Sequence, residues 1–435
     1  MRTDILLKDE LINSVKNEVL PALGCTEPIS LALACAIAAS YLGEDITHIE
    51  AKVSPNLMKN GMGVTVPGTG MKGLTIAAAV GALGGDPEGG LEVLRKLTPD
   101  IVEQAKTMIC DNKIRLSLAE NDKLIYSEAT VYSARNRVRV CIADTHTNVI
   151  SIEKNETNLF RKNEEISDEE GNGFSFENVT LEAICDFVRS VPLSEICFIM
   201  EAEYLNDALS REGLSHDYGL NIGATLTRKI EKGYVSEDLL SSIIIRTSAA
   251  SDARMGGAAL PAMSNSGSGN QGIAATMPVV VVADHLNASE EERIRALFLA
   301  HLVAIFIHSK LPRLSAFCAV TTAAMGAAAG MAWLMEKQNT DVVSRAVNNM
   351  IGDITGVICD GASNSCAMKV STAVSSAFKA VLLALDNIRV TGAEGIVAND
   401  VNQSIKNMGS LACHCMQQMD DEILKMMMEK EIRAT

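Results

Sequence analysis

The sequence predicts an α+β protein that is predominantly helical, with antiparallel strands in its N-terminal part and a helical C-terminal part. Residues 114–152 alternate apolar and polar side chains, which is the pattern of half-buried strands. From residue 180 onward, apolar residues recur at helical spacing instead. Hydrophobic residues make up 47% of the 435 residues but aromatic residues only 4%. The core must therefore be built from Ala, Val, Ile, Leu and Met, which suits close helix packing.

We expect three segments along the chain. An α+β lobe covers residues 1–160, a charged linker covers 161–179, and a helical lobe covers 180–435. The linker is predicted because acidic residues and glycines gather between the strand pattern and the helix pattern.

Two helices are predicted near the N-terminus. Apolar residues at four-residue spacing over 9–20 indicate an amphipathic helix that Pro21 ends. Residues 29–42 are almost wholly apolar, and Thr26 is a suitable N-cap for a second, buried helix. Cys25 then lies directly before that helix.

The rest of the first lobe is predicted to be strands and one further helix. Residues 46–66 have β character with a turn at 60–61, and 74–83 read as helix. The Gly-rich segment 67–73, which contains Lys72, lacks the Gly-Lys-[Ser/Thr] ending of a phosphate-binding loop. We interpret it as a tight turn from strand to helix.

In the second lobe, a polar segment interrupts apolar helices. Residues 263–272 are rich in Ser, Asn and Gly, and such a loop can either form an anion-binding nest or act as a plain linker. Helices are expected over 192–212, 235–254 and 290–308, and His301 and His308 of the last are interpreted as core residues. The uncharged segment 314–335 is rich in Ala and Gly, which favours a buried helix over a membrane span.

Three cysteines share one predicted setting, at or beside the N-terminus of an apolar helix. Cys25 precedes Thr26, and Cys318 falls in the first turn of a helix that Ser315 can cap. Cys359 precedes a predicted helix over 364–387, for which Asp360 and Ser363 are the candidate N-caps. Helix N-termini favour thiolates, which bind metals or attack electrophiles. The alternative is that these are buried structural cysteines.

The spacing of the cysteines points to a particular kind of metal centre. The sequence has no CxxC pair, which zinc sites and electron-transfer clusters usually use. Three ligands from separate segments suit an iron–sulfur cluster with one open iron, which is a Lewis acid. Cys413 and Cys415 lie two apart, so on a helix they point in different directions and are interpreted as structural.

Charge and cysteine usage limit the partners that we expect. With 38 basic and 54 acidic residues the net charge is −16, which argues against nucleic acid or an anionic membrane as the main partner. Eleven scattered cysteines and no signal-like N-terminal run predict free thiols in the cytoplasm. Helices with small-residue interfaces are also compatible with a homodimer.

Four stretches of the chain resemble the L-cysteine desulfidase family, which is related to the alpha region of iron–sulfur L-serine dehydratases. They are Gly24-Cys25-Thr26-Glu27-Pro28, the loop 264–272, Ala316-Phe317-Cys318-Ala319 and Ile358-Cys359-Asp360-Gly361-Ala362-X-Asn364-Ser365-Cys366-Ala367-X-Lys369. The resemblance implies an oxygen-sensitive [4Fe-4S] cluster, no pyridoxal phosphate, and breakdown of L-cysteine to hydrogen sulfide, ammonia and pyruvate.

The resemblance also implies roles for individual residues. Cys25, Cys318 and Cys359 match the cluster ligands, and Cys366 is a second-tier candidate, because a fourth protein ligand would leave no open iron. The carboxylate pocket of the substrate is placed at Asn265, Ser266, Ser268 and Asn270. The general base is not identified; Lys369 and Lys72 are candidates.

Two other functions stay open on the sequence alone. One is a hydro-lyase with the same cluster that acts on L-serine or a related amino acid. The other is a non-catalytic iron–sulfur sensor or binding protein, which would hold a cluster but turn over neither amino acid.

Overall fold

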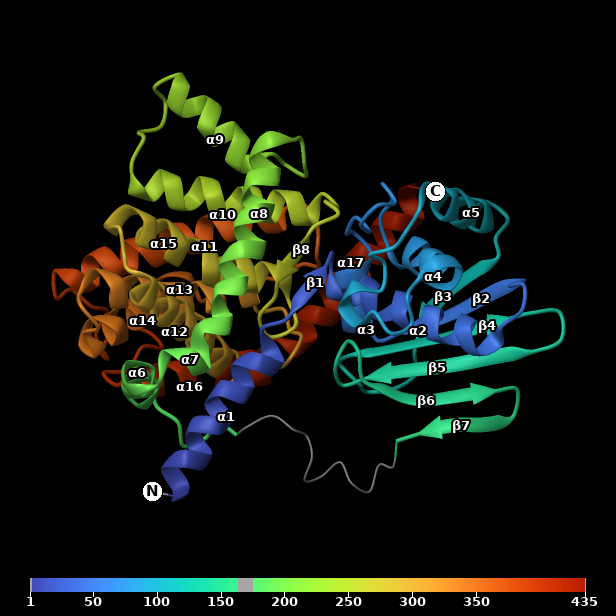
Figure 1. Ribbon diagram of the computed structural model, residues 1–435, viewed down its shortest axis with the longest axis horizontal. Coiled ribbons are helices and arrows are strands. Elements are labelled where there is room, and N and C mark those ends of the chain that lie inside the picture. Colours follow the sequence, from blue (N-terminus) through green and yellow to red (C-terminus); the bar gives the residue numbers. More distant parts are fainter. Residues whose placement is uncertain (1, 163–174, 435) are drawn as a thin grey trace.

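The computed structural model describes residues 2–162 and 175–434. It confirms the predicted α+β class: a region of packed helices lies beside a region built around a sheet (Figure 1). Most of the predicted linker, residues 163–174, lies outside the described residues.

The N-terminal half contains both helices and strands. Its helices are α1 (Arg2–Glu18), α2 (Thr26–Leu42), α3 (Pro55–Gly61), α4 (Leu74–Gly84), the short 3₁₀ helix η1 (Gly90–Glu92) and α5 (Pro99–Cys110). Its strands are β1 (Pro21–Leu23), β2 (His48–Val53), β3 (Ile114–Leu118), β4 (Tyr126–Tyr132), β5 (Arg137–Ala143), β6 (Val149–Lys154) and β7 (Thr157–Arg161).

The C-terminal half is helical apart from one short strand. Its elements are α6 (Leu181–Ser190), α7 (Leu193–Ile196), the 3₁₀ helix η3 (Cys197–Ile199), α8 (Met200–Ser215), α9 (Ile222–Glu231), α10 (Leu239–Met255), β8 (Pro261–Met263), α11 (Gly269–Leu286), α12 (Glu290–His308), α13 (Ala319–Met335), α14 (Thr340–Ile354), α15 (Cys366–Leu385), α16 (Val401–Cys415) and α17 (Gln417–Ala434).

The main sheet is mixed and has the strand order β3-β2-β4-β5-β6-β7. Strands β4 to β6 form an antiparallel meander as predicted, with Val131 opposite Val138 between β4 and β5, and β7 extends it beyond the predicted residues. Strand β3 departs from the prediction, because it runs parallel to β2 with Ile49 opposite Ile114. The parallel pairing is possible because α3 and α4 carry the chain back across the sheet and α5 returns it to the β2 edge.

Helices α2 and α4 cover one face of this sheet and share a core with it (Figure 1). The prediction of β structure over 46–66 is wrong in its second half, where α3 forms. Ser54 occupies the N-cap of α3 and Pro55 its first position, where a missing N–H costs nothing. Helices α2 and α4 approach closely because Gly81 has no side chain; a Cβ there would lie 2.4 Å from the carbonyl oxygen of Ala32.

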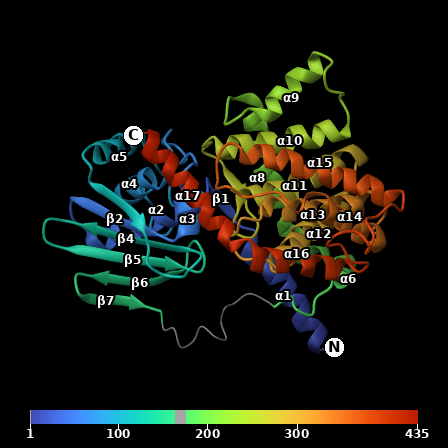
Figure 2. The same ribbon diagram turned by 180° about the vertical axis from the view of Figure 1, so that it is seen from behind.

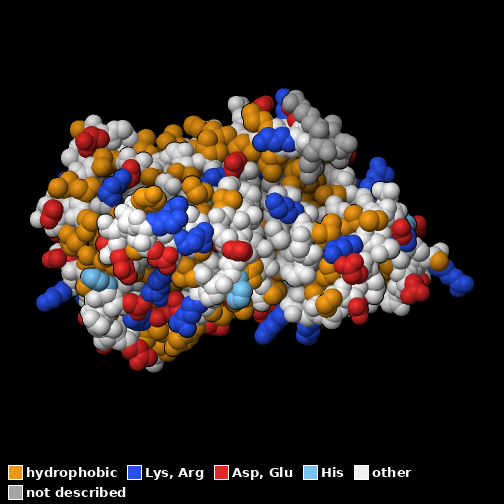
Figure 3. Space-filling model, turned by 90° about the horizontal axis from the view of Figure 1, so that it is seen from above, with side chains coloured by type: hydrophobic (Ala, Val, Ile, Leu, Met, Phe, Trp, Pro, Cys, Tyr) orange, Lys and Arg blue, Asp and Glu red, His pale blue; other side chains and the backbone are white. Residues whose placement is uncertain are grey.

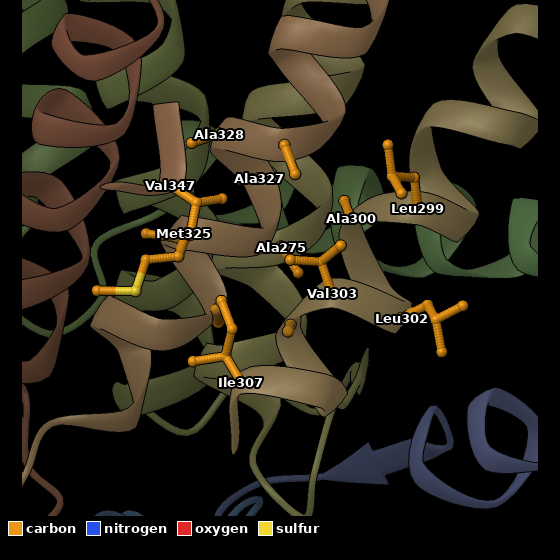
Figure 4. Close-up of a cluster of buried hydrophobic side chains, with 14 of the residues drawn as sticks. Ala275, Leu299, Ala300, Leu302, Val303, Ile307, Met325, Ala327, Ala328 and Val347 are labelled. Atoms are coloured by element: carbon orange, nitrogen blue, oxygen red, sulfur yellow. The ribbon is translucent and has the colours of Figure 1, made fainter. Parts of the chain in front are cut away.

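The helical region packs around α13, which contacts α11, α12, α14 and α15. As predicted, the uncharged segment forms a buried helix: residues 320–333 of α13 are all buried. Figure 4 shows the centre of this core, where Met325 and Ala327 of α13 lie among apolar side chains of α11, α12 and α14. Among the described residues, only α15 is long and apolar enough to cross a membrane, and half of it is buried inside the protein.

Several segments connect the two regions. Strand β1 pairs with β8, so that Pro21 lies opposite Met263. Helix α1 packs in the core of the helical region, whereas α17 crosses to the sheet region and packs on α3, as both ribbon views show (Figure 2). The buried ammonium group of Lys59 holds α17 through an ion pair with Asp420, at 2.5 Å.

The surface gives no sign of one large charged patch on the face that Figure 3 shows. Basic and acidic side chains are interspersed there with apolar ones. On this face, the excess negative charge of the chain is therefore not gathered into a single field.

Candidate metal centre and substrate pocket

Four cysteines from separate segments line one cavity with a volume of about 100 Å³. They are Cys25, Cys318, Cys359 and Cys366, so the structure brings together the three predicted ligands and the second-tier candidate. Every cysteine of the chain is a free thiol. The other seven, including the predicted structural pair of α16, do not line this cavity.

Three of the four cysteines lie at helix N-termini, although not all where the sequence predicts. Cys25 itself, not Thr26, is the N-cap residue of α2, and Cys318 is the N-cap residue of α13. Helix α15 begins at Cys366, after Ser365 at the N-cap. The prediction that Cys359 precedes a helix is therefore wrong: Asp360 and Ser363 do not cap α15, and Cys366 is the cysteine at its N-terminus.

Cys359 reaches the site through a short antiparallel bridge. The N–H of Cys359 donates to the carbonyl of Ala316 at 2.7 Å, and the N–H of Cys318 donates to Val357 at 3.0 Å. Phe317 and Ile358 form the bridge between these bonds. Cys318 and Cys359 are thus fixed on adjacent segments, far apart in sequence, by backbone hydrogen bonds.

The turn that carries Cys25 is held against the polar loop of the helical region. The hydroxyl of Thr26 donates to the carbonyl of Gly267 at 2.8 Å, and the N–H of Ser264 donates to Leu20 at 2.9 Å. Gly24 has a φ of 76° and packs against Pro67, so a side chain there would both strain the backbone and clash.

Burial outweighs the helix N-termini in the electrostatics of these thiols. It raises the pKa of Cys25, Cys318 and Cys366 to about 12. The backbone N–H groups of Val320 and Thr321 lower the pKa of Cys318, as the sequence argument expects, but by less. These three thiols are therefore protonated at neutral pH in the absence of a metal, and metal binding must release their protons.

The four cysteines of the cavity wall are the candidate ligands of a metal group. Among the described residues, no three His, Cys, Asp or Glu side chains converge closely enough to hold one metal ion. In a [4Fe-4S] cluster each thiolate binds a different iron, so the sulfurs surround the cluster and do not meet at one point. Four cysteines from separate segments line this one cavity, which is the kind of arrangement that a cluster requires.

The polar loop forms the other wall of the cavity. Of the four residues predicted to bind the substrate carboxylate, Ser266, Ser268 and Asn270 line the cavity, whereas Asn265 does not. The side-chain N–H of Asn265 donates a hydrogen bond to the Nδ1 atom of His301 at 3.1 Å, and its side-chain oxygen accepts one from the hydroxyl of Ser266 at 2.9 Å. Ser266 has a φ of 48°, a conformation that this hydrogen bond helps to fix. Asn265 therefore supports the wall instead of forming it.

The two histidines of α12 differ. His301 is a satisfied core residue as predicted, because Asn265 and Thr276 bond both of its ring nitrogens, and burial lowers its pKa to about 3. His308 lines the cavity, and neither of its ring nitrogens has a partner. Burial lowers the pKa of His308 to about 4, with a further contribution from Arg313, so its imidazole is neutral.

Several buried polar atoms of the cavity wall have no protein partner. Besides both ring nitrogens of His308, they include Nε2 of His146, Nε of Arg254 and Oε1 of Gln271. Buried polar atoms are rarely left unpaired without a ligand or water. This set therefore marks the cavity as a candidate binding site for a polar ligand.

The two candidate bases lie differently with respect to the cavity, and neither lines it. Lys72 is exposed. Lys369 hydrogen bonds to Asp360; burial alone would lower its pKa, but Asp360 and the nearby Cys366 and Cys318 raise it. A lysine held protonated in this way is poorly suited to accept a proton.

Sequence reasoning missed the polar residues that come from outside the predicted loop. Arg254 lies in the last turn of α10, and His146 lies in the turn between β5 and β6. In the sequence these two residues stand out only as an arginine and a histidine within apolar or β patterns. Such a pattern does not reveal whether a side chain is buried or which way it points.

Comparison with known proteins identifies the family. Residues 88–425 match the model of a family described as serine dehydratase alpha chain. A UPF0597 protein of Actinobacillus pleuropneumoniae serotype 3 is 59% identical over 424 residues, which cover 98% of each chain. A UPF0597 protein of Chromobacterium violaceum is 58% identical over 428 residues, which cover 98% of this chain and 99% of the other. The UPF0597 protein YhaM of Salmonella gallinarum is 56% identical over 428 residues, which cover 98% of each chain.

Proposed function

The chain belongs to the serine dehydratase alpha chain family, and from that premise we propose that it is an iron–sulfur lyase that degrades L-cysteine to hydrogen sulfide, ammonia and pyruvate. The observation that carries this proposal is the cavity in which four cysteines face a wall of hydroxyl and amide groups. Three of these cysteines lie within the residues that match the family model, and Cys25 lies before them.

The cysteines are proposed to hold the metal group. Cys25, Cys318 and Cys359 would be the ligands of a [4Fe-4S] cluster. Cys366 is the second-tier candidate, because a fourth protein ligand would leave no open iron. When bound, the cluster with one iron left open would supply a Lewis acid. At the start of α13, the backbone N–H groups of Val320 and Thr321 favour the deprotonated form of Cys318 that a ligand needs.

The remaining residues would position the substrate and exclude water. The hydroxyls of Ser266 and Ser268 and the amide of Asn270 offer donors to a bound amino acid. The neutral His308, with both ring nitrogens unpartnered, is the candidate of the cavity wall to accept a proton. Loss of the α-proton and of the β-thiol as hydrogen sulfide leaves aminoacrylate, which takes up water to give ammonia and pyruvate.

A second candidate function is the elimination of water from L-serine. The family model favours it, because its description names a serine dehydratase. The two substrates share the amino acid head and differ only in the leaving group. The cavity wall contains donors that suit either substrate, so leaving-group preference must be measured. A non-catalytic iron–sulfur protein would bind a cluster in the same cavity but release pyruvate from neither amino acid.

The deciding experiment supplies each amino acid separately to anaerobically reconstituted protein and measures pyruvate and sulfide. The proposal expects both products from L-cysteine, in equal amounts. Pyruvate from L-serine alone would exclude the desulfidase, and a loaded protein that releases neither product would support the non-catalytic alternative. The variant Cys110→Ser is a control, because this exposed cysteine lies outside the cavity and its loss should leave turnover unchanged.

A further inference from the structure

Arg254 is a buried cation that lacks a carboxylate partner. It is 3% exposed, at the end of α10. Its Nη1 atom contacts the sulfur of Met255 at 3.2 Å, its Nη2 atom contacts the sulfur of Cys25 at 3.4 Å, and its Nε atom has no partner. Among the described residues, no carboxylate forms an ion pair with this guanidinium. Burying a charge in this way is costly unless a ligand compensates it.

Other arginines of this chain show what a paired guanidinium looks like. Arg246 bonds Asp207 at 2.8 Å and Asp284 at 2.6 Å. Arg295, which is 9% exposed, bonds Glu291 and the carbonyls of Val188 and Val191. Arg254 is more deeply buried than either, yet only weak sulfur acceptors meet it. The guanidinium of Arg254 therefore donates no hydrogen bond to an oxygen atom among the described residues.

The guanidinium faces the cavity between the cysteines and the polar loop. Arg254 lines the cavity together with Cys25 and Ser268. Gly269 makes room for it, because a Cβ on that residue would lie 2.3 Å from the Nε atom of Arg254. The unpartnered Oε1 atom of Gln271 lines the same wall and is 3% exposed. A ligand bound here would thus meet the guanidinium of Arg254 and, in the same cavity, the side-chain oxygen of Gln271, which can accept a hydrogen bond.

We propose that Arg254 binds the α-carboxylate of the amino acid substrate and thereby restricts the site to ligands with a free carboxylate. A planar guanidinium matches a carboxylate with two parallel hydrogen bonds, whereas an amide or ester offers only one acceptor oxygen in that geometry and no charge. The proposal rests on the proposed function for the identity of the substrate, but the carboxylate preference can be measured without turnover.

A competing role for Arg254 is to neutralise Cys25. The guanidinium lies against that sulfur and would stabilise its thiolate, so loss of the charge could weaken metal binding without affecting the substrate directly. The two roles make different predictions for a lysine substitution. Lysine keeps a positive charge near Cys25, but it cannot form the two parallel hydrogen bonds to a carboxylate.

The experiment compares L-alanine with L-alaninamide as ligands of anaerobically reconstituted protein. L-alanine has the α-carboxylate but no leaving group, so its binding can be followed by calorimetry whether or not the protein is a lyase. We expect wild type to bind L-alanine at least about tenfold more tightly than the amide. Arg254→Gln should lose this discrimination, and Arg254→Lys should weaken it while it keeps its iron content. The exposed Arg228→Gln is the control and should retain the discrimination.

The outcomes separate this proposal from the proposed function. Undiminished discrimination in Arg254→Gln or in Arg254→Lys, or a wild-type protein that binds both ligands equally or neither, would overturn the role of Arg254. Loss of iron from Arg254→Lys, with affinity falling in proportion, would assign the residue to Cys25 instead. If wild type discriminates as expected but releases no sulfide from L-cysteine, the desulfidase proposal fails and the carboxylate site stands.

Discussion

Replacing Asn265 by alanine should destabilise the protein by more than an ordinary surface substitution, because its amide joins the polar loop to the helical core. Asn265 and His301 are both fully buried, and Ser266 is nearly so. The substitution leaves Nδ1 of His301 and the hydroxyl of Ser266 without their partners. Each buried group left unpaired costs about 1–3 kcal/mol, so we expect a loss of about 2–6 kcal/mol.

Thermal unfolding of Asn265→Ala and of a matched control measures this loss. Asn339→Ala removes an exposed N-cap of α14, which should cost only about 1 kcal/mol. We expect the Tm of Asn265→Ala to fall clearly below that of the control. Equal Tm values for the two variants would refute the view that Asn265 supports the cavity wall through these bonds.

Two further predictions concern groups that flank the site. Burial raises the pKa of Asp252 to about 6, from 3.8 in the unfolded chain, so the folded state holds the proton more tightly and stability is lost as the pH rises from about 4 to 6. The free energy of unfolding of Asp252→Asn should therefore rise by about 2–3 kcal/mol relative to that of wild type between pH 4 and pH 7. Denaturant unfolding at the two pH values would measure this rise, and a pH-independent difference would contradict it. Gly272→Ala would place a Cβ 1.9 Å from the carbonyl oxygen of Met263 and should impair folding, as judged by soluble yield and Tm. In Gly356→Ala the new Cβ meets no atom within 4 Å, so this control should fold normally. Similar behaviour of the two variants would show that β8 and α11 can separate.

The sequence predicts the cysteine set because local chemistry marks it. Cys25 and Cys318 stand where an apolar helix begins, and that position depends on neighbouring residues alone. The position of Cys359 could not be derived in this way. It depends on a bridge to the segment before Cys318, which pairs residues far apart in the chain. Helix caps were misplaced by one to several residues because several residues near each start could serve.

The protonation of the cysteines and the role of Arg254 lay beyond the sequence for a different reason. Both depend on burial, and burial is a property of the assembled core. The helix N-terminus at Cys318 favours a thiolate, but the surrounding protein raises the pKa of this thiol by more. Likewise, an arginine at the end of a helix is ordinarily exposed, and only the packing of α10 against the Gly269 segment encloses Arg254.

Iron and acid-labile sulfide content of the anaerobically reconstituted protein test the central claim most directly. The account predicts about four irons and four sulfides per chain in wild type and in Cys110→Ser, and a clear loss of both in Cys25→Ser, Cys318→Ser and Cys359→Ser. Undiminished iron and sulfide in all three of these variants, or a wild-type protein that contains no iron and still releases sulfide from L-cysteine, would contradict it.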